Sequence, residues 1–137
     1  MRQSSSESGN VVVEFVGVLI ILVVPALLAM LAISSLLMGQ AAATAAARDA
    51  GRAFVRAENT SQGRLRAEAI AVESFAQRGV DADVILDVRC SAVPCLVPGA
   101  YVTTTVRAQV PLSYLGMSVT LRETVTLPVD ELREQRE

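Results

Sequence analysis

The chain has 137 residues, 52% of them apolar, with a formal net charge of −2 and a pI near 5.2. This length provides for one membrane anchor and at most one small domain. All 12 basic residues are arginines, and they are scattered rather than gathered into the basic face that phosphate binding requires, so no nucleic-acid partner is expected. Histidine is absent, which removes the commonest metal ligand and the commonest general base at neutral pH.

The chain opens with a polar segment followed by a long apolar run. Residues 1–9, MRQSSSESG, are Ser-rich and without periodicity, so we expect disorder there. Val11–Met38 then form a run of 28 residues that is too long and too uniformly apolar for the buried face of a small domain, and they predict a transmembrane helix. A removable secretory signal is the alternative, but its apolar region is about half as long.

The predicted span is longer than the membrane requires. A helix over Val11–Met38 measures about 42 Å, against about 30 Å of hydrocarbon, so it should tilt or project at one end. Pro25 removes one backbone hydrogen bond, which predicts a kink near the middle.

The residues that follow are strong helix formers. The sequence AAATAAARDAGRAFVRAE predicts that the helix runs out into water to about Glu58, giving one helical segment over residues 10–58. A stripe of arginines at four-residue spacing lies on one of its faces: Arg48, Arg52 and Arg56. Such a stripe is more often a solvated face than a partner surface.

A short second helix is predicted after a break at Asn59–Gly63. Thr60 or Ser61 can cap a helix over Arg64–Arg78, and Gly79 supplies its C-terminal stop.

The C-terminal half has the period of strands. Alternating apolar residues mark three strands around Val84–Cys90, Val102–Val110 and Met117–Leu127, and the short connections favour an antiparallel meander. With the second helix covering one face of that sheet, residues 59–130 form a small α+β head. The charged tail, residues 131–137, is expected to fray.

Two cysteines lie at the end of the first predicted strand. Cys90 and Cys95 enclose Ser-Ala-Val-Pro, a spacing that permits a disulfide-closed loop, while two free thiols or a redox pair are the alternatives. Two thiols without histidine make a poor metal site, so we expect neither metal nor cofactor. A disulfide would place the head in an oxidising compartment, outside the cytoplasm.

Gly9, four further residues, Glu14 and Phe15, followed by the apolar run, resemble a class III (type IV pilin-like) signal. The chain as a whole resembles the TadE-like minor pilins and pseudopilins of tight-adherence (Tad/Flp) pilus systems. The likeness extends to the helix AAATAAARDAGRA and to the strands VTTTVRAQVPL and VTLRETVTLPVDELRE, and so covers most of the chain.

The resemblance implies that a prepilin peptidase cuts after Gly9, leaving Asn10 as the new amino terminus and residues 1–9 as the leader. It also implies that the Glu14 carboxylate pairs with the amino terminus of a neighbouring subunit during assembly. Such a pair is physically reasonable, since a carboxylate in lipid costs a few kcal/mol unless it is protonated, reaches the interface or meets a cation. The expected partners are then the lipid bilayer, the peptidase, other pilin or pseudopilin subunits and the Tad assembly platform.

The expected location is the cytoplasmic membrane, with a single pass and an extracytoplasmic head, or a surface pilus used in adhesion or secretion. Positive-inside counting alone predicts the opposite orientation, because Arg2 stands against Arg48, Arg52 and Arg56. The cleavage signal and the cysteine pair favour the external head.

The two other function classes are an uncleaved binding protein and an enzyme. An uncleaved single-pass protein that holds an envelope partner with its sheet is the alternative; Gly9 would then be a linker residue and Glu14 would reach the headgroups. An enzyme is not expected, since the sequence has no histidine, no Gly-x-Ser-x-Gly and no phosphate-binding Gly-rich loop, and no small-molecule substrate is expected either.

Overall fold

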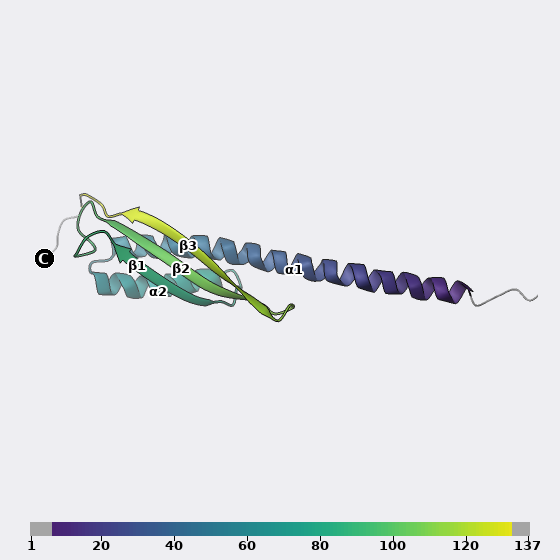
Figure 1. Cartoon of the computed structure of the whole chain (residues 1–137). Coiled ribbons are helices and arrows are strands. Elements are labelled where there is room, and N and C mark those ends of the chain that lie inside the picture. The colour runs from purple at the N-terminus through teal and green to yellow at the C-terminus, as the bar shows by residue number, and fades with distance from the viewer. Residues whose placement is uncertain (1–6, 133–137) are drawn as a thin grey trace, which may run out of the picture.

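The computed structural model describes residues 7–132, which form two helices followed by three strands (Figure 1). The elements are α1 (Glu7–Arg56), α2 (Thr60–Ala76), β1 (Asp83–Cys90), β2 (Tyr101–Leu112) and β3 (Met117–Pro128). The long apolar helix, the short helix and the antiparallel sheet confirm the predicted α+β fold. Most of the predicted leader (residues 1–6) and of the charged tail (residues 133–137) lies outside the described residues.

α1 is one continuous helix of 50 residues in two different environments. Most of its exposed half, Asn10–Met38, stands away from the rest of the chain (Figure 1). From Gly39 onwards α1 packs with α2 and the sheet, and these parts together are called the head below. The helix already begins at Glu7, so the expectation of disorder through Gly9 is wrong for its last three residues, because adding residues to an existing helix costs little.

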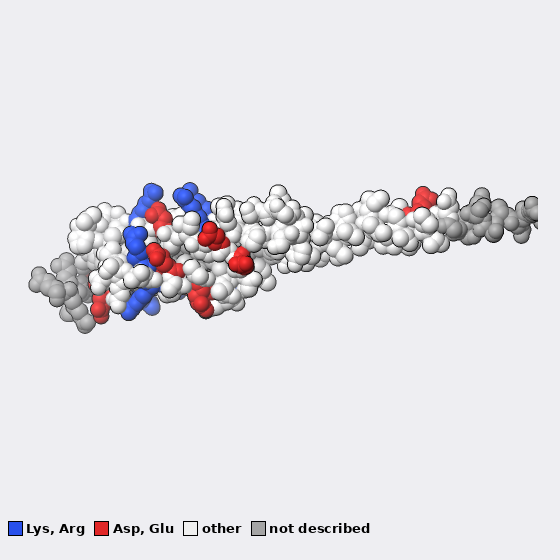
Figure 2. Space-filling model, turned by 90° about the horizontal axis from the view of Figure 1, so that it is seen from below, with Lys and Arg blue, Asp and Glu red and all other residues white. Residues whose placement is uncertain are grey.

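Pro25 does not interrupt α1. Two views at right angles show no sharp bend in the exposed half, so the predicted kink is not observed (Figures 1 and 2). The fixed backbone angle of proline suits a helix, and the hydrogen bonds on both sides of the missing one hold the helical path.

α2 folds back along α1 after a break of only three residues, 57–59. Its N-cap is Asn59, whose Oδ1 accepts a hydrogen bond of 2.8 Å from the Gln62 amide, so the predicted cap at Thr60 or Ser61 is wrong. Gly63 is a contact point rather than a breaker, since a Cβ there would lie 3.1 Å from the Cβ of Ala57. Gly79 follows the C-terminus with φ +65°, which confirms the predicted stop.

The three strands form one antiparallel sheet in the order β1-β2-β3, as their period predicted. β2 pairs with β3 along its whole length, from Tyr101 opposite Pro128 to Leu112 opposite Met117. The residues of β2 that the alternation assigns to the core are all buried: Val102, Thr104, Val106, Ala108 and Val110.

The core lies between this sheet and the alanine-rich face of α1. Six side chains on that face have no exposed surface: Ala42, Ala43, Ala46, Ala47, Ala50 and Phe54. α1 covers β2 and β3, while α2 lies against α1 and β1, so the second helix, which was expected to cover one face of the sheet, covers only the β1 side of it. The helix expected to run out into water is instead half-buried, with Arg48, Arg52 and Arg56 on its exposed side. Small side chains allow this close approach.

Candidate functional site: the exposed half of α1 and the two ends of the head

The exposed half of α1 has almost no contact with the rest of the chain. Apolar side chains point outwards along its whole length, including Val13 and Ile21, each 71% exposed, and Met30, 69% exposed. In length and composition this helix is capable of crossing a membrane. Water is therefore an unfavourable surrounding for it.

Charged residues are confined to the two ends of this apolar surface. The sequence has none between Glu14 and Arg48. On the face shown in Figure 2, arginines and carboxylates gather over the head, and a long uncharged stretch of α1 separates them from the far end of the helix. The part of the exposed half that follows Glu14 is thus a charge-free and largely apolar rod.

Glu14 lies at the beginning of this rod. Asn10 is four residues earlier in the same helix, so the two residues lie on one face, and both are exposed. Phe15 is 63% exposed beside them. Towards the head, the next cation along α1 is Arg48, about 51 Å away along the helix axis. The head therefore offers no counter-ion to Glu14.

Gly9 and Asn10, the predicted cleavage site, lie in the first turn of α1. The first amides of a helix have no partner within it, and helix ends fray. A protease that acts between Gly9 and Asn10 would need to open only this turn.

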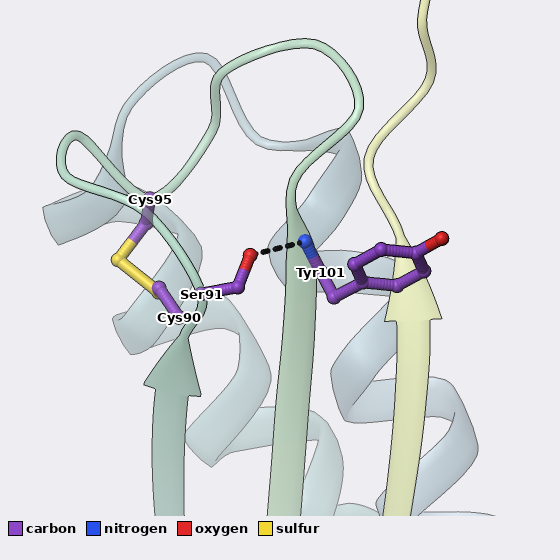
Figure 3. The surroundings of a disulfide bond; sticks show 4 residues. All are labelled: Cys90, Ser91, Cys95 and Tyr101. Atoms are coloured by element: carbon purple, nitrogen blue, oxygen red, sulfur yellow. Dashed lines mark hydrogen bonds between the residues drawn. A yellow bond between two sulfur atoms is a disulfide. The ribbon is translucent and has the colours of Figure 1, made fainter.

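The predicted disulfide is present at the opposite end of the molecule. Cys90, the last residue of β1, is bonded to Cys95, with 5.2 Å between their Cα atoms. Beside it, the Tyr101 amide donates a hydrogen bond of 2.9 Å to the Ser91 hydroxyl, and the Ser91 amide donates one of 2.9 Å to the Tyr101 carbonyl (Figure 3). The disulfide loop thus sits on the end of the head that is distal to the apolar rod (Figure 1).

The proximal end of the head carries a feature that the sequence interpretation missed. The hairpin between β2 and β3 reaches further along α1 towards its N-terminus than any other part of the head (Figure 1). Its tip exposes Tyr114 (60%), Leu115 (48%) and Met117 (57%). Apolar residues in a turn, where polar ones are usual, were the available signal.

Comparison with known proteins gives no match: no protein-family model, no curated protein and no solved structure is matched by this chain.

Proposed function

We propose that this chain is a TadE-like minor pilin or pseudopilin of a Tad/Flp pilus system, held in the cytoplasmic membrane by the exposed half of α1 and cleaved after Gly9 by a prepilin peptidase. The observation that carries the proposal is the position of Glu14. It stands at the start of the charge-free apolar rod, shortly after Gly9 and Asn10, on a helix that continues without interruption into a folded head.

The apolar rod needs an apolar surrounding in every state of the protein. Before assembly, the lipid bilayer supplies this apolar surrounding. The rods of neighbouring subunits supply it after assembly, when they pack side by side and exclude both water and lipid. A single helix with apolar side chains on all faces suits both situations, because no face of it depends on the head for burial.

The cysteine pair supports an extracytoplasmic head. Disulfides form and persist in oxidising compartments and are rare in the cytoplasm. Closing a loop as short as that between Cys90 and Cys95 stabilises the fold by about 2 kcal/mol in the chain-entropy model, a useful amount for a small head. The leader and the cleavage site would then lie on the cytoplasmic side.

Cleavage would supply the cation that Glu14 lacks. The new α-amino group on Asn10 would lie about 6 Å from the level of Glu14 along the axis. A parallel neighbour shifted by one helical turn would bring its own Asn10 ammonium level with this Glu14. The two charges would then neutralise each other at the edge of the lipid, where an unpaired carboxylate is costly.

Cleavage is the direct test. Intact-mass analysis of the protein from cells that contain a prepilin peptidase should show a chain that begins at Asn10, and the same analysis from cells without the peptidase should show the full-length chain. Gly9→Ala should block the processing, because the added methyl group hinders close approach of the protease and strengthens the helix at the cut.

Gly17→Ala is the matched control. It makes the same change in the same helix, and a Cβ at Gly17 meets nothing within 4 Å, so its processing should equal that of the wild type. A wild-type chain that keeps its leader in the presence of the peptidase would instead support the uncleaved membrane-anchored binding protein.

A further inference from the structure

We infer that the tip of the β2–β3 hairpin, Ser113–Met117, is a membrane-contacting element that inserts into the headgroup layer beside α1 and thereby fixes the depth of the transmembrane helix. This inference rests on the membrane anchoring proposed above. It adds that lipid headgroups cover the end of the head that lies nearest the apolar rod, and that Glu14 and Ser34 mark the two boundaries of the hydrocarbon.

The hairpin tip shares a shallow hollow with the end of the exposed half of α1. The hollow has a volume of about 310 Å³ and is lined by Ser34, Ser35 and Met38 of α1, by Arg78 and Asp81 after α2, and by Tyr114 of the hairpin, among others. Tyr114 therefore stands at the level of Ser34–Met38.

Charges set the outer limit of the hydrocarbon. Arg78 and Asp81 are exposed, and charged side chains are costly inside hydrocarbon. Since both line the same hollow as Ser34, we place the end of the hydrocarbon on the N-terminal side of Ser34.

The remaining helix matches the membrane thickness. From Ser34 back to Glu14 there are 20 residues, which span about 30 Å, the thickness of the hydrocarbon core. The segment within the hydrocarbon, Phe15–Ile33, contains no charged residue. Glu14 bounds this slab at one end and Ser34 at the other. The surplus of the apolar run is divided between the two ends: residues 34–38 lie beside the hairpin, and Val11–Val13 lie beyond Glu14 at the level of the other headgroup layer, so no tilt is needed. Gly9 then lies about 7.5 Å beyond Glu14 along the helix axis, on the side away from the head, where a cut can occur outside the hydrocarbon.

The side chains of the tip suit the interface rather than water. Tyrosine combines an apolar ring with a hydroxyl and is enriched at the level of the headgroups. Leu115 and Met117, 48% and 57% exposed, can lose contact with water there. Gly116, with φ +63°, makes the tight turn that presents them together.

The test uses tryptophan fluorescence, because the chain has no tryptophan of its own; of its two tyrosines, Tyr101 begins β2 and Tyr114 lies in the turn two residues beyond the end of that strand. The full chain carrying Tyr114→Trp is reconstituted into vesicles of palmitoyl-oleoyl-phosphatidylcholine, with or without phosphatidylcholine brominated on its acyl chains near the carbonyls. The expected result is a blue-shifted emission that loses most of its intensity on the brominated lipid.

Tyr101→Trp is the matched control. Tyr101 is exposed to a similar extent, 56% against 60% for Tyr114, but lies about 40 Å away along the strand. Its emission should stay red-shifted and unquenched. Leu22→Trp, near the centre of the slab, should be quenched more strongly by lipid brominated deeper in the acyl chains.

The outcomes separate the two proposals. Quenching of Leu22→Trp without quenching of Tyr114→Trp would overturn the hairpin contact and leave the membrane span intact. A blue shift of Tyr114→Trp without quenching would show that protein, such as a second copy, covers the tip, and would also overturn it. Absence of quenching at Leu22→Trp would overturn the span and this inference together, whereas failure of cleavage after Gly9 would leave this inference standing.

Discussion

The hydroxyl of Thr104, in the middle strand of the sheet, donates a hydrogen bond of 2.9 Å to the backbone carbonyl of Ala47 in α1. Both residues are fully buried. Because 57 residues separate them in sequence, this bond ties the helix that carries the apolar rod to the centre of the head. Close packing at this point fixes the C-terminal part of α1 against the sheet.

Thr104→Val should destabilise the head. The substitution keeps the shape of the side chain and removes the buried donor, which is worth about 1 kcal/mol. Thr103→Val, on the opposite face of the same strand, is the control, since its hydroxyl pairs with that of Thr126 at the surface, where water can replace it. Urea unfolding of the full chain in detergent micelles measures both. Equal stability of Thr104→Val and the wild type would contradict a contribution from the Ala47 contact.

Gly51→Ala should also destabilise the head, although alanine is the better helix former. A Cβ at this position would lie 2.9 Å from Leu127 Cδ1 and 3.0 Å from Thr104 Oγ1. Leu127 can turn away, but Thr104 is stiff and held by Ala47, so the helix must move outwards, at a cost of about 1–3 kcal/mol. The thermal midpoint followed by circular dichroism should fall. Gly17→Ala, which meets no atoms, should not lower it, and equal midpoints for the two variants would rule out the close contact.

Glu14→Gln should abolish a specific crosslink between subunits. The chain contains no lysine, so after cleavage its only primary amine is the α-amino group of Asn10. A carbodiimide, which joins an amine directly to a carboxylate, should therefore link neighbouring subunits through Asn10 and Glu14 if these groups form an ion pair. Mass spectrometry of the crosslinked dimer identifies the bond.

Glu68→Gln, in an exposed part of α2, removes a carboxylate from the head and should leave that crosslink unchanged. Crosslinked dimers that persist in Glu14→Gln would show that the amino terminus pairs elsewhere. A link found only within single chains would show that Glu14 pairs with its own amino terminus.

The order and type of the elements followed from local patterns. The apolar run of Val11–Met38 is long enough to predict a helix surrounded by lipid or by other apolar helices. The period-two alternation of β2 and β3 places the apolar side chains of each strand on one face of the sheet, which then faces the core. Cys90 and Cys95 were close enough in sequence for their bond to be predicted. Each of these signals is contained within a few adjacent turns or residues.

The packing of the head was decided only in three dimensions. An alanine stretch forms a helix equally well in water and in a core, so nothing local in Ala42–Ala50 indicates that the sheet covers it. The same limit applies to Gly51, because its close contact is with Thr104 of the sheet, 53 residues later in the sequence. It applies also to the hairpin tip, because its position beside Ser34 depends on how the sheet packs on α1. Contacts between small side chains distant in sequence leave no periodic trace, because their energy comes from shape and close approach rather than from strong preferences of each residue.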